Sequence, residues 1–132
     1  MKRNTHIIGS IVFALFGTLL IKIILNRSIP VNIVNLLKIF INMHPLVFLI
    51  MIVASITGGI IPDILDPPFT KRHRRYAHSK MLFLLFIIIT FITIGLIYLN
   101  QNYLILWLLY YFLIGYISHL ILDSLTPAGL WG

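Results

Sequence analysis

The sequence predicts an all-α, polytopic membrane protein with about four transmembrane helices. Of its 132 residues, 60% are hydrophobic and only 10% are charged, whereas a soluble domain has roughly 45–50% apolar and about 25% charged residues. Mean hydropathy is +1.04. A chain with so few polar side chains cannot cover its surface against water, so lipid must solvate much of it. The length suits one domain, and we treat residues 1–132 as a single membrane-embedded domain.

Four apolar stretches predict the spans. They are Ile7–Leu25, Pro45–Ile61, Met81–Leu99 and Tyr103–Leu122, and each is near the roughly 20 residues that cross a hydrocarbon core of about 30 Å. A fifth segment, Val31–Met43, mixes asparagines and a lysine with aliphatic residues. This segment either lies in the membrane interface or extends the second span.

Polar and helix-breaking residues mark the ends of these spans. The segment Asn26–Pro30 is predicted to end the first helix, and Gly58-Gly59 followed by Pro62 is predicted to end the second. The segment Asn100–Asn102 predicts a tight polar turn between the last two helices.

The distribution of lysine and arginine predicts the orientation. With four spans, both termini and the loop between the second and third spans share one face. That face holds Lys2, Arg3, Lys71, Arg72, Arg74, Arg75 and Lys80, and the other holds Lys22, Arg27 and Lys38. Because basic residues concentrate in cytoplasmic loops, we predict a multi-pass protein of the cell membrane with both termini in the cytoplasm. The same bias accounts for the net charge of +7, so nucleic acid is not expected as a direct partner.

The three acidic residues of the chain and four of its five histidines fall on this predicted cytoplasmic face. Ionisable groups at a membrane surface are costly and are kept where they pair, line a wet cavity or bind an ion. The seven residues are His6, Asp63, Asp66, His73, His78, His119 and Asp123. They predict a metal site without thiolate ligands, because the chain has no cysteine. The fifth histidine, His44, falls on the opposite face, where we expect it to cap a helix.

Two spacings within this set suit metal chemistry. His119 and Asp123 are four residues apart, so on a helix they share one face and can reach the same ion. The alternative is a hydrogen-bonded pair at a helix end. Asp63 and Asp66 can bind a cation, or supply one ligand and one base. The alternative is a solvated turn in which both face water.

The segment between the second and third spans combines His73 and His78 with five cations. One interpretation is an anchor for lipid headgroups. The other has the histidines as metal ligands and Arg74 and Arg75 as clamps for a phosphate or carboxylate of the substrate. Both bind an anion, and the sequence leaves them open.

Four sequence blocks resemble one known family. They are Thr5-His6; Gly59-Ile-Ile-Pro-Asp63-Ile-Leu-Asp66; His73-Arg-Arg-Tyr-Ala77-His78-Ser79; and Gly115-Tyr-Ile-Ser-His119-Leu-Ile-Leu-Asp123-Ser-Leu-Thr-Pro127-Ala-Gly129. In this order they resemble the small inner-membrane metal-dependent hydrolases described as LexA-binding or LexA-regulated. The chain departs from that family at Ala77, where a threonine is usual. The helix with His119 and Asp123 is more faintly similar to the zinc-dependent phospholipase C and nuclease P1 group.

The residues and the resemblance together lead to the hypothesis of a metal-dependent hydrolase acting at the level of the lipid headgroups. One or two divalent ions, most plausibly zinc, would be held by a subset of the seven residues, and an unligated aspartate among Asp63, Asp66 and Asp123 would accept the proton of water. Its substrate would be an anionic small molecule or lipid, with a phosphate ester favoured. The alternative is a non-enzymatic membrane scaffold with a structural metal, or one that docks a cytoplasmic protein. Ion transport is disfavoured, because no charged residue lies in mid-span.

Overall fold

The computed structural model describes residues 3–25, 44–66, 77–100, 103–126 and 130. Within them lie four helices: α1 (Arg3–Leu25), α3 (Pro45–Leu65), α4 (Lys80–Leu99) and α5 (Leu104–Ser124). Each is long and apolar enough to cross a membrane, which confirms the predicted fold class. The segment Val31–Met43 and the basic segment with His73, Arg74 and Arg75 lie outside the described residues.

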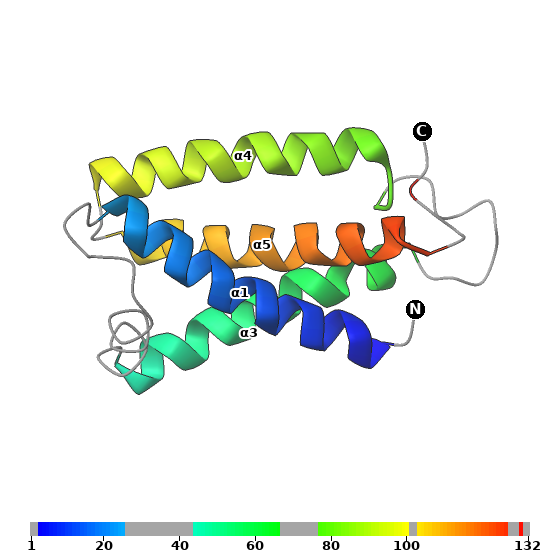
Figure 1. Cartoon of the computed structure of the whole chain (residues 1–132), viewed down its shortest axis with the longest axis horizontal. Helices are drawn as coiled ribbons and strands as arrows, with labels where there is room; N and C mark the ends of the chain where they lie inside the picture. The colour runs from blue at the N-terminus through cyan, green and yellow to red at the C-terminus, as the bar shows by residue number, and fades with distance from the viewer. Residues whose placement is uncertain (1–2, 26–43, 67–76, 101–102, 127–129, 131–132) are drawn as a thin grey trace.

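Helix α5 is the central element of the bundle. It packs against α1, α3 and α4, and α1 also packs against α3. Figure 1 shows α4 running alongside α5 while α1 and α3 cross on the other side. The helices alternate in direction, so the first turn of α1, the last turn of α3, the start of α4 and the last turn of α5 lie together (Figure 1). We name this the cluster end; the opposite end, with the last turn of α1 and the starts of α3 and α5, is the far end.

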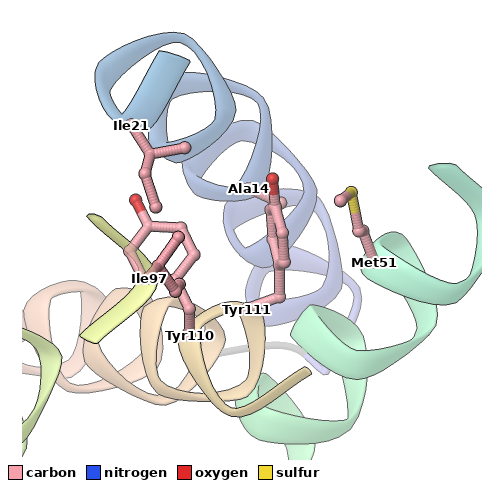
Figure 2. Close-up of a cluster of buried hydrophobic side chains, with 6 residues drawn as sticks. All are labelled: Ala14, Ile21, Met51, Ile97, Tyr110 and Tyr111. Carbon is pink, nitrogen blue, oxygen red and sulfur yellow. The ribbon is translucent and has the colours of Figure 1, made fainter. Parts of the chain in front are cut away.

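Aromatic side chains of α5 fill the centre of the bundle toward its far end. Figure 2 shows the cluster of buried residues, contributed by all four helices: Ala14, Ile21, Met51, Ile97, Tyr110 and Tyr111. The Tyr110 hydroxyl donates to the carbonyl of Gly17 at 3.0 Å, and the Tyr111 hydroxyl lies 2.8 Å from the hydroxyl of Thr18. Lipid offers no hydrogen-bond partners, so these internal pairs satisfy the hydroxyl groups and join α5 to α1.

The prediction that Gly58-Gly59 followed by Pro62 ends the second helix is wrong. Helix α3 continues through Gly58, Gly59 and Pro62 to Leu65. Glycine and proline are tolerated in membrane helices when neighbouring helices compensate for the lost backbone contacts. Pro62 is buried against the rest of the bundle. The other three predicted spans agree with the helices to within a few residues.

Glycines set the separation of α3 and α5. A Cβ atom at Gly58 would collide with the carbonyl oxygen of Phe112, and one at Gly115 would collide with the carbonyl of Ser55. The two backbones therefore touch at these positions, as small residues allow in membrane bundles. In a soluble protein the Gly58-Gly59 pair would be typical of a helix end. Here both glycines lie inside α3, in its contact surface with the neighbouring helices.

Side chains cap the N-termini of two of the helices. The Ser79 hydroxyl accepts the backbone N–H of Leu82 at 3.1 Å at the start of α4. His44 begins α3, and its Nδ1 accepts the backbone N–H of Leu46 at 3.3 Å. The expectation that His44 caps a helix is confirmed, and it lies at the far end, away from His6, His78 and His119. At the outer surface, large apolar side chains such as Phe16, Phe91 and Ile105 are exposed, as a lipid-facing surface requires.

Candidate metal centre

The structure brings six of the seven predicted site residues to the cluster end. They come from the first turns of α1, the end of α3, the residues before α4 and the last turns of α5: His6, Asp63, Asp66, His78, His119 and Asp123. The seventh, His73, lies outside the described residues, as do Arg74 and Arg75. Groups separated by more than a hundred residues in the sequence are thus in contact, because an even number of spans separates them.

Four side chains each direct one donor atom to a common point. The Nε2 atoms of His78 and His119 are 3.1 Å apart, and Oδ2 of Asp123 lies 3.2 Å from the first and 3.3 Å from the second. Oδ1 of Asp63 lies 3.7 Å from both nitrogens. One donor atom from each of the four residues lies within 4.8 Å of every other. We call this group the donor cluster.

These separations fit a tetrahedral ion. With metal–ligand bonds of about 2.0–2.2 Å, ligand atoms at the corners of a tetrahedron lie roughly 3.3–3.6 Å from one another. Five of the six separations are 3.1–3.7 Å, close to this interval, and the pair Asp63 and Asp123 lies within 4.8 Å. Two imidazole nitrogens and two carboxylate oxygens are a donor set that zinc accepts. The predicted sharing of one helix face by His119 and Asp123 is confirmed.

Burial makes this concentration of charge expensive without a cation. The side chains of His78, His119 and Asp123 are 1%, 0% and 4% exposed, whereas that of Asp63 is 31% exposed. Burial disfavours the charged form of His78, but the carboxylates of Asp123 and Asp63 outweigh it and raise its pKa to about 9. The carboxylates therefore stabilise positive charge at this point, whether a proton or a metal ion supplies it.

A backbone carbonyl sets the tautomer of His119. The Nδ1 atom of this ring lies 2.7 Å from the carbonyl oxygen of Gly59. A carbonyl can only accept, so Nδ1–H donates and the neutral ring presents the lone pair of Nε2 to the donor cluster. Metal-binding histidines are typically held in this way.

Asp66 faces the outer nitrogen of His78 and does not reach the donor cluster. Its Oδ2 lies 3.7 Å from Nδ1 of His78, too long for a hydrogen bond. Both atoms are buried and have no hydrogen-bond partner. Because Asp66 is only 5% exposed, the alternative of a solvated turn is wrong for this residue. A small inward movement would pair them, and the carboxylate would then orient the ring as it does behind many metal-bound histidines.

His6 closes the site on the α1 side. Its ring stacks on that of His119 with centroids 3.9 Å apart, and its Nε2 lies 3.5 Å from Oδ1 of Asp123. His78 and His119 contact the other carboxylate oxygen of Asp123, Oδ2. His6 is 2% exposed, and its Nδ1 has no hydrogen-bond partner. Because His6 contacts Oδ1 of Asp123 and not Oδ2, it lies beside the donor cluster and is not one of its four members.

Two supporting contacts could not be predicted from the sequence. The Tyr116 hydroxyl donates to the carbonyl of Ala77 at 3.0 Å and holds the residue before His78 against α5. Tyr116 precedes His119 by three residues, so only its position one turn away on the same helix hinted at this role. The carbonyl of Gly59 has no sequence signal, because every residue carries one.

A family model described as YdjM inner membrane protein matches residues 1–131. The chain belongs to this family. Its description agrees with four apolar, membrane-length helices, and the protein is therefore a multi-pass protein of the inner membrane. No curated protein and no solved structure matches the chain.

The family description names a location and no reaction. The comparisons lend no support to the hydrolase resemblance or to the fainter similarity to phospholipase C and nuclease P1. Catalysis, the binding of a metal and its kind, and the cytoplasmic position of the termini therefore stay predictions.

Proposed function

We propose that this protein is a metal-dependent hydrolase whose ion is held by His78, His119 and Asp123. The observation that carries the proposal is the asymmetry of the donor cluster. Three donor atoms lie 3.1–3.3 Å from one another on side chains that are almost fully buried. The fourth, Oδ1 of Asp63, is 3.7 Å from both nitrogens on a side chain that is 31% exposed.

This asymmetry separates catalytic from structural metal sites. Structural zinc sites use four protein ligands, whereas catalytic sites use three and keep a position for water or substrate. His78, His119 and Asp123 supply the three, and two nitrogens with one oxygen favour zinc over calcium or magnesium. The remaining position faces Asp63, the member of the cluster that solvent and substrate reach.

The protein side chains then have distinct tasks. Zinc, when bound, supplies Lewis acidity. The Asp63 carboxylate accepts a proton from water at the exposed side, because it is the least buried carboxylate beside the ion. The Gly59 carbonyl holds His119, and Asp66 would orient His78 after the small inward movement that pairs the two atoms. His6 covers the flat face of His119 and keeps water from the α1 side.

The surroundings of Asp63 favour an amphiphilic, anionic substrate. Ile64 and Leu65 follow it and are 67% and 69% exposed. An apolar surface beside a cation-binding site at the end of a membrane bundle suits a lipid headgroup or another phosphate ester with an apolar group. Arg74 and Arg75 would hold its anionic group in this proposal.

One observation favours a second function. All four donor atoms lie within 4.8 Å of one another, so a small shift of Asp63 would complete a closed, four-ligand site. Such a site would stabilise the bundle without turnover, as expected of a scaffold or of a docking protein for a cytoplasmic partner.

The Asp63→Asn variant distinguishes the two. We would purify it in detergent beside the wild type, measure zinc by mass spectrometry, and assay hydrolysis of bis(para-nitrophenyl) phosphate and para-nitrophenyl phosphate. The hydrolase proposal expects metal in both proteins and turnover in the wild type alone. Loss of metal in the variant, or no turnover by metal-loaded wild type with either ester or with phospholipids, would favour the scaffold.

A further inference from the structure

A cavity lies toward the far end of the bundle, away from the donor cluster. Its volume is about 280 Å³, and it is lined by residues of α1, α3 and α5 and by His44, the cap of α3. Most of the lining is apolar, but Lys22 and His44 introduce two nitrogen donors and Trp107 an indole ring. A lysine, a histidine N–H and a tryptophan beside an apolar wall are typical of protein surfaces at the headgroup level of a membrane.

Lys22 has no acidic partner for its charge. The chain contains only three acidic side chains, and all of them lie at the cluster end. His6 and Lys22 stand on the same helix sixteen residues apart, a distance of about 24 Å along its axis. In the sequence, the stretches 26–43 and 101–102 that connect the helices at the far end contain no acid and add Arg27 and Lys38. No acidic side chain of the protein therefore pairs with Lys22, so an anion bound there would come from outside the protein.

His44 presents a donor to the same cavity. Its Nδ1 accepts the backbone N–H of Leu46, so the neutral ring carries its proton on Nε2. Lys22 and this Nε2–H together can donate to the oxygens of one phosphate group.

The apolar lining continues beyond the cavity. Ile50 and Leu108 line it and also line a second hollow of about 520 Å³ between α3 and α5, whose wall is almost wholly hydrophobic. Together the two provide an anion site next to a groove for hydrocarbon. Free phosphate would satisfy Lys22 but would leave the apolar walls uncovered.

We propose that this cavity binds an anionic phospholipid, with the phosphate at Lys22 and His44 and acyl carbons along Ile50 and Leu108. The lipid sits at the membrane face opposite the donor cluster. Its site is therefore separate from the proposed hydrolase site and stands whether or not that proposal holds.

Trp107 lines the cavity and provides a local probe. The chain has two tryptophans, so a Trp131→Phe background leaves Trp107 alone. We would titrate this protein in nonionic detergent with phosphatidylglycerol or phosphatidylcholine brominated on the acyl chains, which quench tryptophan on contact. The variants are Lys22→Gln and, as a matched control at the cluster end, Lys80→Gln.

Half-maximal quenching is expected at about fivefold lower phosphatidylglycerol than phosphatidylcholine, the preference that one lysine at an anionic surface provides. Lys22→Gln should abolish this preference, Lys80→Gln should keep it, and millimolar inorganic phosphate should not displace the lipid. Equal quenching by both lipids in the parent protein, or a preference that survives Lys22→Gln, would overturn the proposal. Displacement by free phosphate would reassign the cavity to a small anion. Because each preference is a ratio within one variant, a partly destabilised variant still gives an answer.

Discussion

The Nε2 atoms of His78 and His119 face one another at 3.1 Å in the interior of the cluster end. The first residue precedes α4 and the second belongs to α5, so the contact joins two helices through two basic groups. Asp123 approaches both from the same side. Two buried imidazoles in this arrangement need either a shared proton or a cation, and the carboxylates around them favour positive charge.

Removing the central ligands should remove the metal. Replacing both His119 and Asp123 with alanine deletes two of the three closest donor atoms, so we expect less than one-tenth of the wild-type metal content, by mass spectrometry of detergent-purified protein. His44→Ala is the matched control, because that histidine lies at the far end, and should bind metal normally. A double variant with full metal content would refute the site.

Asp66→Asn should weaken metal binding without abolishing it. The carboxylate faces Nδ1 of His78 and does not reach the donor cluster, and loss of such a supporting group lowers affinity about 10–100-fold. Zinc competition with a chromogenic chelator measures the change, and the stoichiometry at saturation should stay that of the wild type. Thr57→Ala serves as control, since its exposed hydroxyl bonds only its own helix. An unchanged affinity would show that Asp66 has no part in orienting His78.

Metal affinity should rise with pH. In the metal-free protein the pKa of His78 is raised to about 9, because Asp123 and Asp63 outweigh its burial. Below that pH an incoming ion must displace the proton, so affinity increases up to about tenfold per pH unit and levels off above about pH 9. Titrations between pH 6 and 9 test this, with His44→Gln expected to give the same slope. A flat profile would mean that His78 is not the protonated ligand.

Gly115→Ala should destabilise the bundle while Gly95→Ala should not. A Cβ at Gly115 meets the backbone carbonyl of Ser55, whereas one at Gly95 meets nothing within 4 Å. Overpacking typically costs about 1–3 kcal/mol, and the change at Gly95 should be neutral or slightly stabilising because alanine favours helix. Unfolding in mixed micelles with increasing dodecyl sulfate gives both values. Equal effects of the two substitutions would contradict the close approach of α3 and α5.

The two ends of the bundle should differ in accessibility to a membrane-impermeant thiol reagent. The chain has no cysteine, so single substitutions at the exposed Asn4 and Tyr103 report without background. If both termini are cytoplasmic, as the lysine and arginine count predicts, spheroplasts should label Tyr103→Cys and leave Asn4→Cys unlabelled until they are permeabilised. The reverse pattern would place the donor cluster on the outer face.

The sequence was sufficient to predict that six of the seven candidate residues, those within the described part of the chain, would meet at one end. It did not predict how they would divide their tasks. Hydropathy and span parity alone bring His6 and Asp123 to the same end, because each span reverses the chain. The spacing of Asp63 and Asp66 does not reveal that one faces the donors and the other faces the back of His78. That distinction depends on α3 continuing through Pro62 to Leu65, and on the close approach of α3 and α5 at Gly58 and Gly115. Such contacts between distant segments leave no local pattern.

The sparse attachment of α4 has a consequence for how the protein assembles. Helices α1, α3 and α5 all pack against one another, whereas α4 packs chiefly on α5. His78 lies just before α4. An ion shared by His78, His119 and Asp123 would fasten this helix to the other three. Metal loading and the docking of α4 would then be one equilibrium. Metal starvation should accordingly yield an inserted chain in which α4 detaches from α5, and a protease should cut beside α4 first.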